Sequence, residues 1–148
     1  MKLIPTGEMT LGPFFPREFA QGANDLTVLE GHKARGELIE VSGRITQLDG
    51  RPLDNVVVEI WQADSRGRYD APDLAAVEGR LPHINFLLLY SGLMRQLQTV
   101  MFFELGADPV LDAVPVARRE LLVAKRLTGG YRFDIRLRGE TETPFFDD

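Results

Sequence analysis

Apolar and polar residues alternate along several stretches of the chain, and a period of two residues is typical of β-strands that bury one face. Segment 37–46 alternates in this way and is followed at 47–54 by a turn signal, an Asp-Gly pair with a proline close behind. Segment 55–62 is rich in β-branched residues and contains the only tryptophan. Segments 83–90 and 97–104 indicate two further strands. These stretches predict a sheet built largely of antiparallel strands.

The last third of the chain predicts one helix and another strand. Segment 116–127 follows a proline, places apolar residues at roughly helical spacing and is followed by Gly129-Gly130, so we expect a helix there. Segment 131–139 alternates strictly. Its inward positions are expected to be Tyr131, Phe133, Ile135 and Leu137, and its outward positions Arg132, Asp134, Arg136 and Arg138. The fold class predicted is a mostly β, antiparallel sandwich with one helix in the C-terminal half.

Residues 1–26 are punctuated by prolines and carry several phenylalanines, which disfavours regular structure but requires a surface to pack against. We therefore expect an extended N-terminal arm over 1–26 and a single β-sandwich domain over 27–148. A chain of 148 residues, 44% hydrophobic and 26% charged, fits one globular domain of this size.

The net charge of −5 argues against nucleic acid or an anionic membrane as the main partner. No apolar run reaches the length of a membrane span, and the N-terminus lacks the continuous apolar stretch of a signal peptide. The chain has no cysteine, which excludes disulfides, thiolate metal sites and a cysteine nucleophile. We expect a cytoplasmic protein.

Few residues are available for catalysis or metal binding. His83 and Asn85 stand two positions apart in a predicted strand, so they share one face; the pair is either a partial metal site or a strand that happens to carry polar residues. Asparagine is a poor ligand for a transition metal, which favours the second interpretation. His32 is expected in a surface loop, Tyr131 in the core and Tyr69 in an exposed turn. These residue types identify no active site by themselves.

Six segments of the chain form a set of motifs in a fixed order: TLGPFFP at 10–16, GRITQLDGRPLDNVVVEIWQADSRGRY at 43–69, PHIN at 82–85, DPVL at 108–111, YRFDIRLRGE at 131–140 and ETPFFD at 142–147. VEIWQAD followed by GRY, together with the YRFDI strand, makes the most specific signature. Taken together, these segments resemble the intradiol ring-cleavage dioxygenases, in particular the alpha subunits of the protocatechuate 3,4-dioxygenases, in which they recur in the same order.

The resemblance implies a fold, an activity and a partner. In that family a ferric iron is held by two tyrosines and two histidines, the histidines forming His-x-His on a strand. This chain matches the first histidine at His83 and replaces the second with Asn85, as alpha subunits do. The implied protein is an iron-free alpha subunit with no catalytic or metal-binding residue of its own. Its Fe(III) is expected on a homologous beta subunit, in a hetero-oligomer that converts protocatechuate and O2 to 3-carboxy-cis,cis-muconate.

The resemblance also implies that Thr10, Gly12 and Pro13 contribute to a shared substrate cavity, where glycine permits close backbone approach. The alternative is that this arm only packs against the partner. Two departures from the family pattern stand out: Ser91 occupies the place of an arginine suited to a substrate carboxylate, and a short segment, 70–81, replaces strands that carry both iron-binding tyrosines. Tyr69 is therefore not assigned as an iron ligand. These departures keep open a second hypothesis, a non-catalytic, degenerate transthyretin-like interaction module that retains only assembly contacts.

Overall fold

The computed structural model describes residues 17–29, 32–63, 79–90, 93 and 95–146 of the chain. These residues form mainly short β-strands with three helical turns: η1 (Arg17–Ala20), α1 (Pro109–Asp112) and η2 (Val116–Leu122). The predicted mostly β fold is therefore confirmed.

One sheet contains β5 (Val57–Trp61), β6 (His83–Leu89) and β7 (Leu97–Phe102) in the order β5-β6-β7. Both pairings are antiparallel, and all three strands lie within the segments predicted from the apolar pattern. Alternate residues of the central strand β6 are buried and half-buried, because one face meets the main core while the other is only partly covered.

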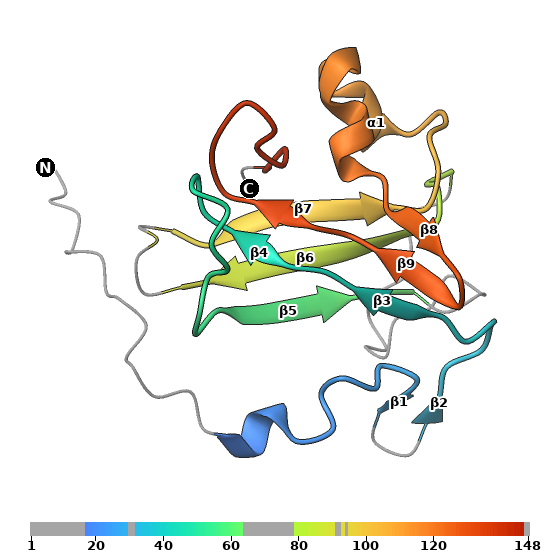
Figure 1. Ribbon diagram of the computed structural model, residues 1–148. Helices are drawn as coiled ribbons and strands as arrows, with labels where there is room; N and C mark the ends of the chain where they lie inside the picture. Colours follow the sequence, from blue (N-terminus) through green and yellow to red (C-terminus); the bar gives the residue numbers. More distant parts are fainter. Residues whose placement is uncertain (1–16, 30–31, 64–78, 91–92, 94, 147–148) are drawn as a thin grey trace, which may run out of the picture.

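A second layer lies across this sheet (Figure 1). It contains β3 (Glu40–Ser42), β8 (Lys125–Leu127) and β9 (Gly130–Arg132) in one sheet, and β4 (Ile45–Thr46) beside β10 (Ile135–Arg136) in another. The pairs β3–β9 and β4–β10 are parallel, so this layer is mixed rather than antiparallel. The segments that form these pairs are far apart in the sequence, so no hairpin forces them to run in opposite directions.

The main core fills the space between the two layers. From the first sheet it takes residues such as Phe86 and Met101, and from the second layer Phe133 and Ile135. A second core cluster lies on the opposite face of β7, where Val100 and Phe102 pack against apolar residues of α1, η2 and the loop between them. Figure 1 shows the helical segment at the end of the sandwich near β7 and β8. Of the positions predicted over 131–138, Phe133 and Ile135 are buried and the three arginines are exposed, as expected. Tyr131 and Leu137 are half-buried and pack against the main core, whereas Asp134, predicted to point outward, is also half-buried.

The helix expected over 116–127 was predicted too long. Residues 116–122 form the 3-10 helix η2, but β8 then pairs with β9 in an antiparallel hairpin. Gly129, with a φ of +88°, lies in the turn of that hairpin, between Leu127 and its partner Gly130. Val116 is 76% exposed, so it does not belong to a buried helical face. The short helix α1 was not predicted.

Residues near the start of the described chain form η1 and a small hairpin of β1 (Val28–Leu29) and β2 (His32–Lys33). The expectation that His32 lies in a loop is therefore wrong for its backbone, because the chain folds back and pairs Leu29 with His32. Most of the predicted N-terminal arm, residues 1–16, lies outside the described residues. Among the described helices, none has the length and apolar character needed to cross a bilayer.

Candidate functional site

His83 and Asn85 lie on the same face of β6, as their spacing predicted, and both are half-buried. This is the face opposite the main core. The cross-strand partner of His83 is Phe102, whose ring centroid is 5.9 Å from that of the imidazole. Asn85 stands between Trp61 of β5 and Val100 of β7. The surroundings of the pair are therefore largely apolar.

The imidazole of His83 is oriented by the backbone just before its own strand. Its Nδ1 lies 2.6 Å from the carbonyl oxygen of Leu81. A carbonyl oxygen only accepts, so this contact requires the proton on Nδ1 and leaves Nε2 as the acceptor of the neutral ring. A histidine held in this way resembles one prepared to bind a metal through Nε2.

A metal site needs more than one such nitrogen. Within the described residues, no group of three or more His, Asp or Glu side chains could hold a metal ion. The next residue on the histidine's face is the amide Asn85, and the residues paired with it, Trp61 and Val100, offer no further oxygen or imidazole nitrogen donor. The described donor set does not fit ferric iron, which prefers several imidazole or anionic oxygen ligands.

Asp108 is a buried polar residue that was not singled out from the sequence. It is only 1% exposed, and its carboxylate accepts three hydrogen bonds. Val110 N lies 2.9 Å from Oδ1, while Leu81 N and Arg80 Nε lie 3.0 and 2.7 Å from Oδ2. The first of these bonds makes Asp108 the N-cap of α1, and the other two attach the segment that leads into β6.

The carboxylate of Asp108 is held in its charged form. Burial alone would raise its pKa, but the hydrogen bonds from Arg80, Leu81 and Val110 outweigh burial and lower the pKa below its ordinary value. The backbone carbonyl of Leu81, the residue whose N–H meets Asp108, accepts from His83. The orientation of His83 therefore depends on the Asp108 contacts through the backbone at Leu81.

The other residues singled out from the sequence are not brought to this face. Tyr131 packs on the main core, as predicted, with its ring edge-on to Phe103 at a centroid distance of 4.8 Å. Thr10, Gly12 and Pro13 lie outside the described residues, as do Tyr69 and Ser91.

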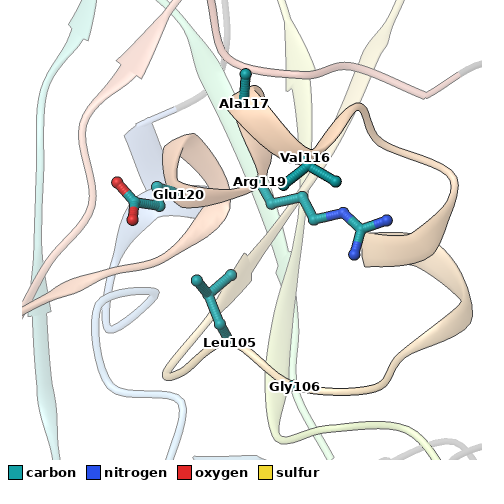
Figure 2. Close-up of a pocket in the computed structure, with 6 residues that line it drawn as sticks. All are labelled: Leu105, Gly106, Val116, Ala117, Arg119 and Glu120. Carbon is teal, nitrogen blue, oxygen red and sulfur yellow. The ribbon is translucent and has the colours of Figure 1, made fainter.

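One hollow of about 440 Å³ lies between the loop after β7 and η2 (Figure 2). Leu105 and Val116 contribute apolar surface, and the side chains of Arg119 and Glu120 point in different directions. The Arg119 guanidinium turns toward the end of α1 and the loop after it: Nη1 lies 3.1 Å from Asp112 Oδ1, and Nε donates to Val114 O at 2.9 Å. Arg119 therefore joins α1 to η2, and the hollow holds no acid–base pair.

Sequence reasoning missed Asp108, although a local signal was present. An aspartate followed directly by a proline is typical of a helix start, with the carboxylate as N-cap and the proline at the first helical position. The contact with Arg80 had no local signal, because it joins residues from different parts of the sandwich.

Comparisons with known proteins identify relatives over nearly the whole chain. A family model described as Dioxygenase matches residues 10–79. The protocatechuate 3,4-dioxygenase alpha chain of Burkholderia cepacia is 30% identical over 194 aligned positions, covering 98% of this chain and 98% of that one. The alpha chain of the same name from Pseudomonas putida is 33% identical over 156 positions, covering 77% of this chain and 78% of that one.

A beta chain is also related. The protocatechuate 3,4-dioxygenase beta chain of Burkholderia cepacia is 28% identical over 201 positions, covering 96% of this chain and 84% of that one. The alignment with the Burkholderia alpha chain has 194 positions, whereas this sequence has 148 residues, so part of that alpha chain has no counterpart here.

Proposed function

The chain belongs to the intradiol ring-cleavage dioxygenases, a family of oxidoreductases, and on this premise we propose that it is the iron-free alpha subunit of a protocatechuate 3,4-dioxygenase-type enzyme. The observation that carries the proposal is the half-site on β6. His83 is oriented with Nε2 as its acceptor, but the residue where the family has its second strand histidine is Asn85. A subunit whose partner carries the iron has no need of that second histidine.

The reaction proposed for the assembled enzyme is the cleavage of protocatechuate by O2 to 3-carboxy-cis,cis-muconate. The bond between the two hydroxyl-bearing ring carbons breaks, both atoms of O2 enter the product, and each of these carbons becomes a carboxyl carbon. Fe(III) on the beta subunit supplies the redox chemistry. Because the described residues of this chain do not fit the metal, no step of the reaction is assigned to them.

The role proposed for this chain is to complete the cavity of its partner. Thr10, Gly12 and Pro13 are the residues proposed to approach the substrate, since glycine permits close backbone approach and proline restricts the path of the arm. The partner is proposed to be a homologous beta subunit, a type of chain to which this one is also related. Cytoplasmic assembly is part of the proposal.

Co-expression of this chain with a His-x-His-bearing homologue tests the proposed alpha-subunit function. The expected result is a coloured ferric complex containing both chains that consumes O2 with protocatechuate and forms the carboxymuconate. The control is the homologue expressed alone, which is expected to be much less active or unstable. A variant of this chain with residues 10–13 replaced by alanine tests the cavity role separately from assembly, since its sandwich domain is unchanged.

The alternative interaction module gives a different result in the same experiment. If the complex forms but turns over equally fast with and without this chain, the chain contributes only assembly contacts and the proposed cavity role is wrong. Iron bound stoichiometrically to the isolated chain would contradict the assignment as the iron-free subunit.

A further inference from the structure

An arginine-lined groove runs over the outer face of the second layer. The alternation that buries Phe133 and Ile135 turns Arg132, Arg136 and Arg138 to the outside. The parallel pairing of β4 with β10 places Ile45 opposite Ile135, which brings Arg44 to the same outer face. These four arginines line a hollow of about 470 Å³ together with two acidic residues, Asp134 and Glu140.

The guanidinium groups in this groove are only partly neutralised within the chain. Arg132 pairs with Asp134, with Nη2 3.0 Å from Oδ2, and Arg136 Nη1 donates to Thr141 Oγ1. Asp134 Oδ1 also accepts from the backbone N–H of Arg44 at 3.1 Å. In the part of the chain that the structure describes, the exposed side chains of Arg44 and Arg138 make no ion pair or hydrogen bond. The groove is therefore locally positive on a chain whose net charge is −5.

The chemistry of the groove selects carboxylates. Guanidinium groups bind carboxylates through two parallel N–H donors, which gives geometric specificity as well as attraction. Single exposed ion pairs contribute little, so a lone small anion gains only weak binding here. A segment with several carboxylates gains from all of them at once, because ordering its backbone costs free energy only once.

The spacing along the strand favours an extended segment. Arg132 of β9, Asp134 and Arg136 of β10 are alternate residues on this outer face, and Arg138 lies in the bend that follows β10. An extended acidic segment lying along this face can place carboxylates against the arginines on either side of Asp134. Asp134 interrupts the row of arginines, so a polyanion of uniform charge such as nucleic acid meets a repulsive carboxylate there, and the negative charge of the whole chain opposes it as well.

We propose that this arginine groove is a docking site for an extended acidic segment of a partner protein, with Asp or Glu at alternate positions. The proposal rests on the geometry of the groove and is independent of the dioxygenase assignment.

Fluorescence anisotropy of the full-length chain with a labelled synthetic peptide that alternates Glu and Ser tests it. Binding is expected at low salt, weakening about tenfold or more as ionic strength rises to physiological values. The double variant R44E/R138E is expected to lose binding at least about tenfold. The double variant K33E/R35E changes the net charge equally, on two exposed residues outside the groove, and is expected to bind nearly as well as the unchanged chain.

Milder variants and competing ligands make the result decisive. R44Q/R138Q removes the charges without reversing them, and its thermal unfolding verifies that the fold persists. Equal binding by R44E/R138E and K33E/R35E would overturn the proposal, as would equal binding of a Lys-Ser peptide. Tighter binding of a short DNA duplex, or displacement of the peptide by an equal concentration of inorganic phosphate, would also overturn it in favour of a general anion site.

Discussion

Arg80 and Asp108 are joined by a buried ion pair that connects the entry of β6 to the start of α1, with Arg80 Nε 2.7 Å from Asp108 Oδ2. The same carboxylate also accepts from Leu81 N and Val110 N, so one side chain fixes two backbone segments. Leu81 in turn accepts from His83, the residue that we propose corresponds to a metal-strand histidine of the family. The pair therefore positions the region where the half-site lies.

Replacing Asp108 by alanine is expected to lower the free energy of unfolding by about 3 kcal/mol. The substitution removes the N-cap of α1 and leaves the largely buried guanidinium of Arg80 without its carboxylate. Urea denaturation followed by circular dichroism measures the change. Asp112→Ala is the matched control, because Asp112 is exposed and its pair with Arg119 is expected to contribute less than about 1 kcal/mol. Equal losses in the two variants would show that the Asp108 contacts do not stabilise the fold specifically.

Stability is expected to fall on acidification, and Asp108 is expected to account for part of that fall. Its folded pKa is lowered, so the unfolded chain binds more protons near the ordinary carboxyl pKa of about 4. The stabilisation is complete above that value and is lost as the pH falls through it toward the folded pKa. Asp108→Asn, which retains an N-cap oxygen, should show a flatter dependence of unfolding free energy on pH below about 5. If the unfolding free energy of the variant and of the unchanged chain depended on pH in the same way, Asp108 would not account for the loss of stability in acid.

Gly43 is expected to tolerate no side chain. It lies between β3 and β4, and a Cβ there would collide with the backbone carbonyl oxygen of Phe133. Gly43→Ala should cost about 2 kcal/mol or more, because the strand pairing must shift. Gly50→Ala is the control: its φ is +77°, but a Cβ would meet no atom within 4 Å, so a cost of about 1 kcal/mol is expected from backbone strain. Thermal unfolding distinguishes the two, and a smaller effect at Gly43 would rule out the close strand contact.

The sequence predicted those strands in which apolar residues are concentrated or alternate with polar ones. β5, β6 and β7 all fall within predicted segments, and the outward row of arginines near β10 follows from alternation alone. The helix expected beyond residue 122 was wrong, because residues 125–127 form backbone hydrogen bonds with β9 instead. The apolar spacing of this segment gave no sign of that pairing. Local propensity gives way to such long-range pairing.

The candidate site was predictable only in part. The shared face of His83 and Asn85 follows from strand geometry, but their surroundings depend on which strands lie beside them. Trp61 and Val100 meet Asn85 only after β5 and β7 have paired with β6. The Arg80–Asp108 pair and the groove that combines Arg44 with Arg138 likewise require contacts between segments far apart in the sequence.

Gly12→Val in the assembled enzyme tests the proposed arm. A bulky side chain at a position proposed to approach the substrate is expected to raise KM for protocatechuate several-fold, while the two chains still co-purify in the same ratio. Lys33→Ala, at an exposed position of β2, is the control and should leave KM unchanged. A Gly12→Val complex that assembles poorly but has a normal KM would show that the arm serves packing alone.

We propose that this chain completes the active site of an iron-bearing partner, and protocatechuate-dependent O2 uptake tests this role. The rate is measured for a purified His-x-His-bearing homologue titrated with this chain. We predict that the rate rises with added chain and saturates at a fixed molar ratio, with iron remaining on the homologue. A rate that does not change across the titration, although the two chains form a complex, would contradict the claim.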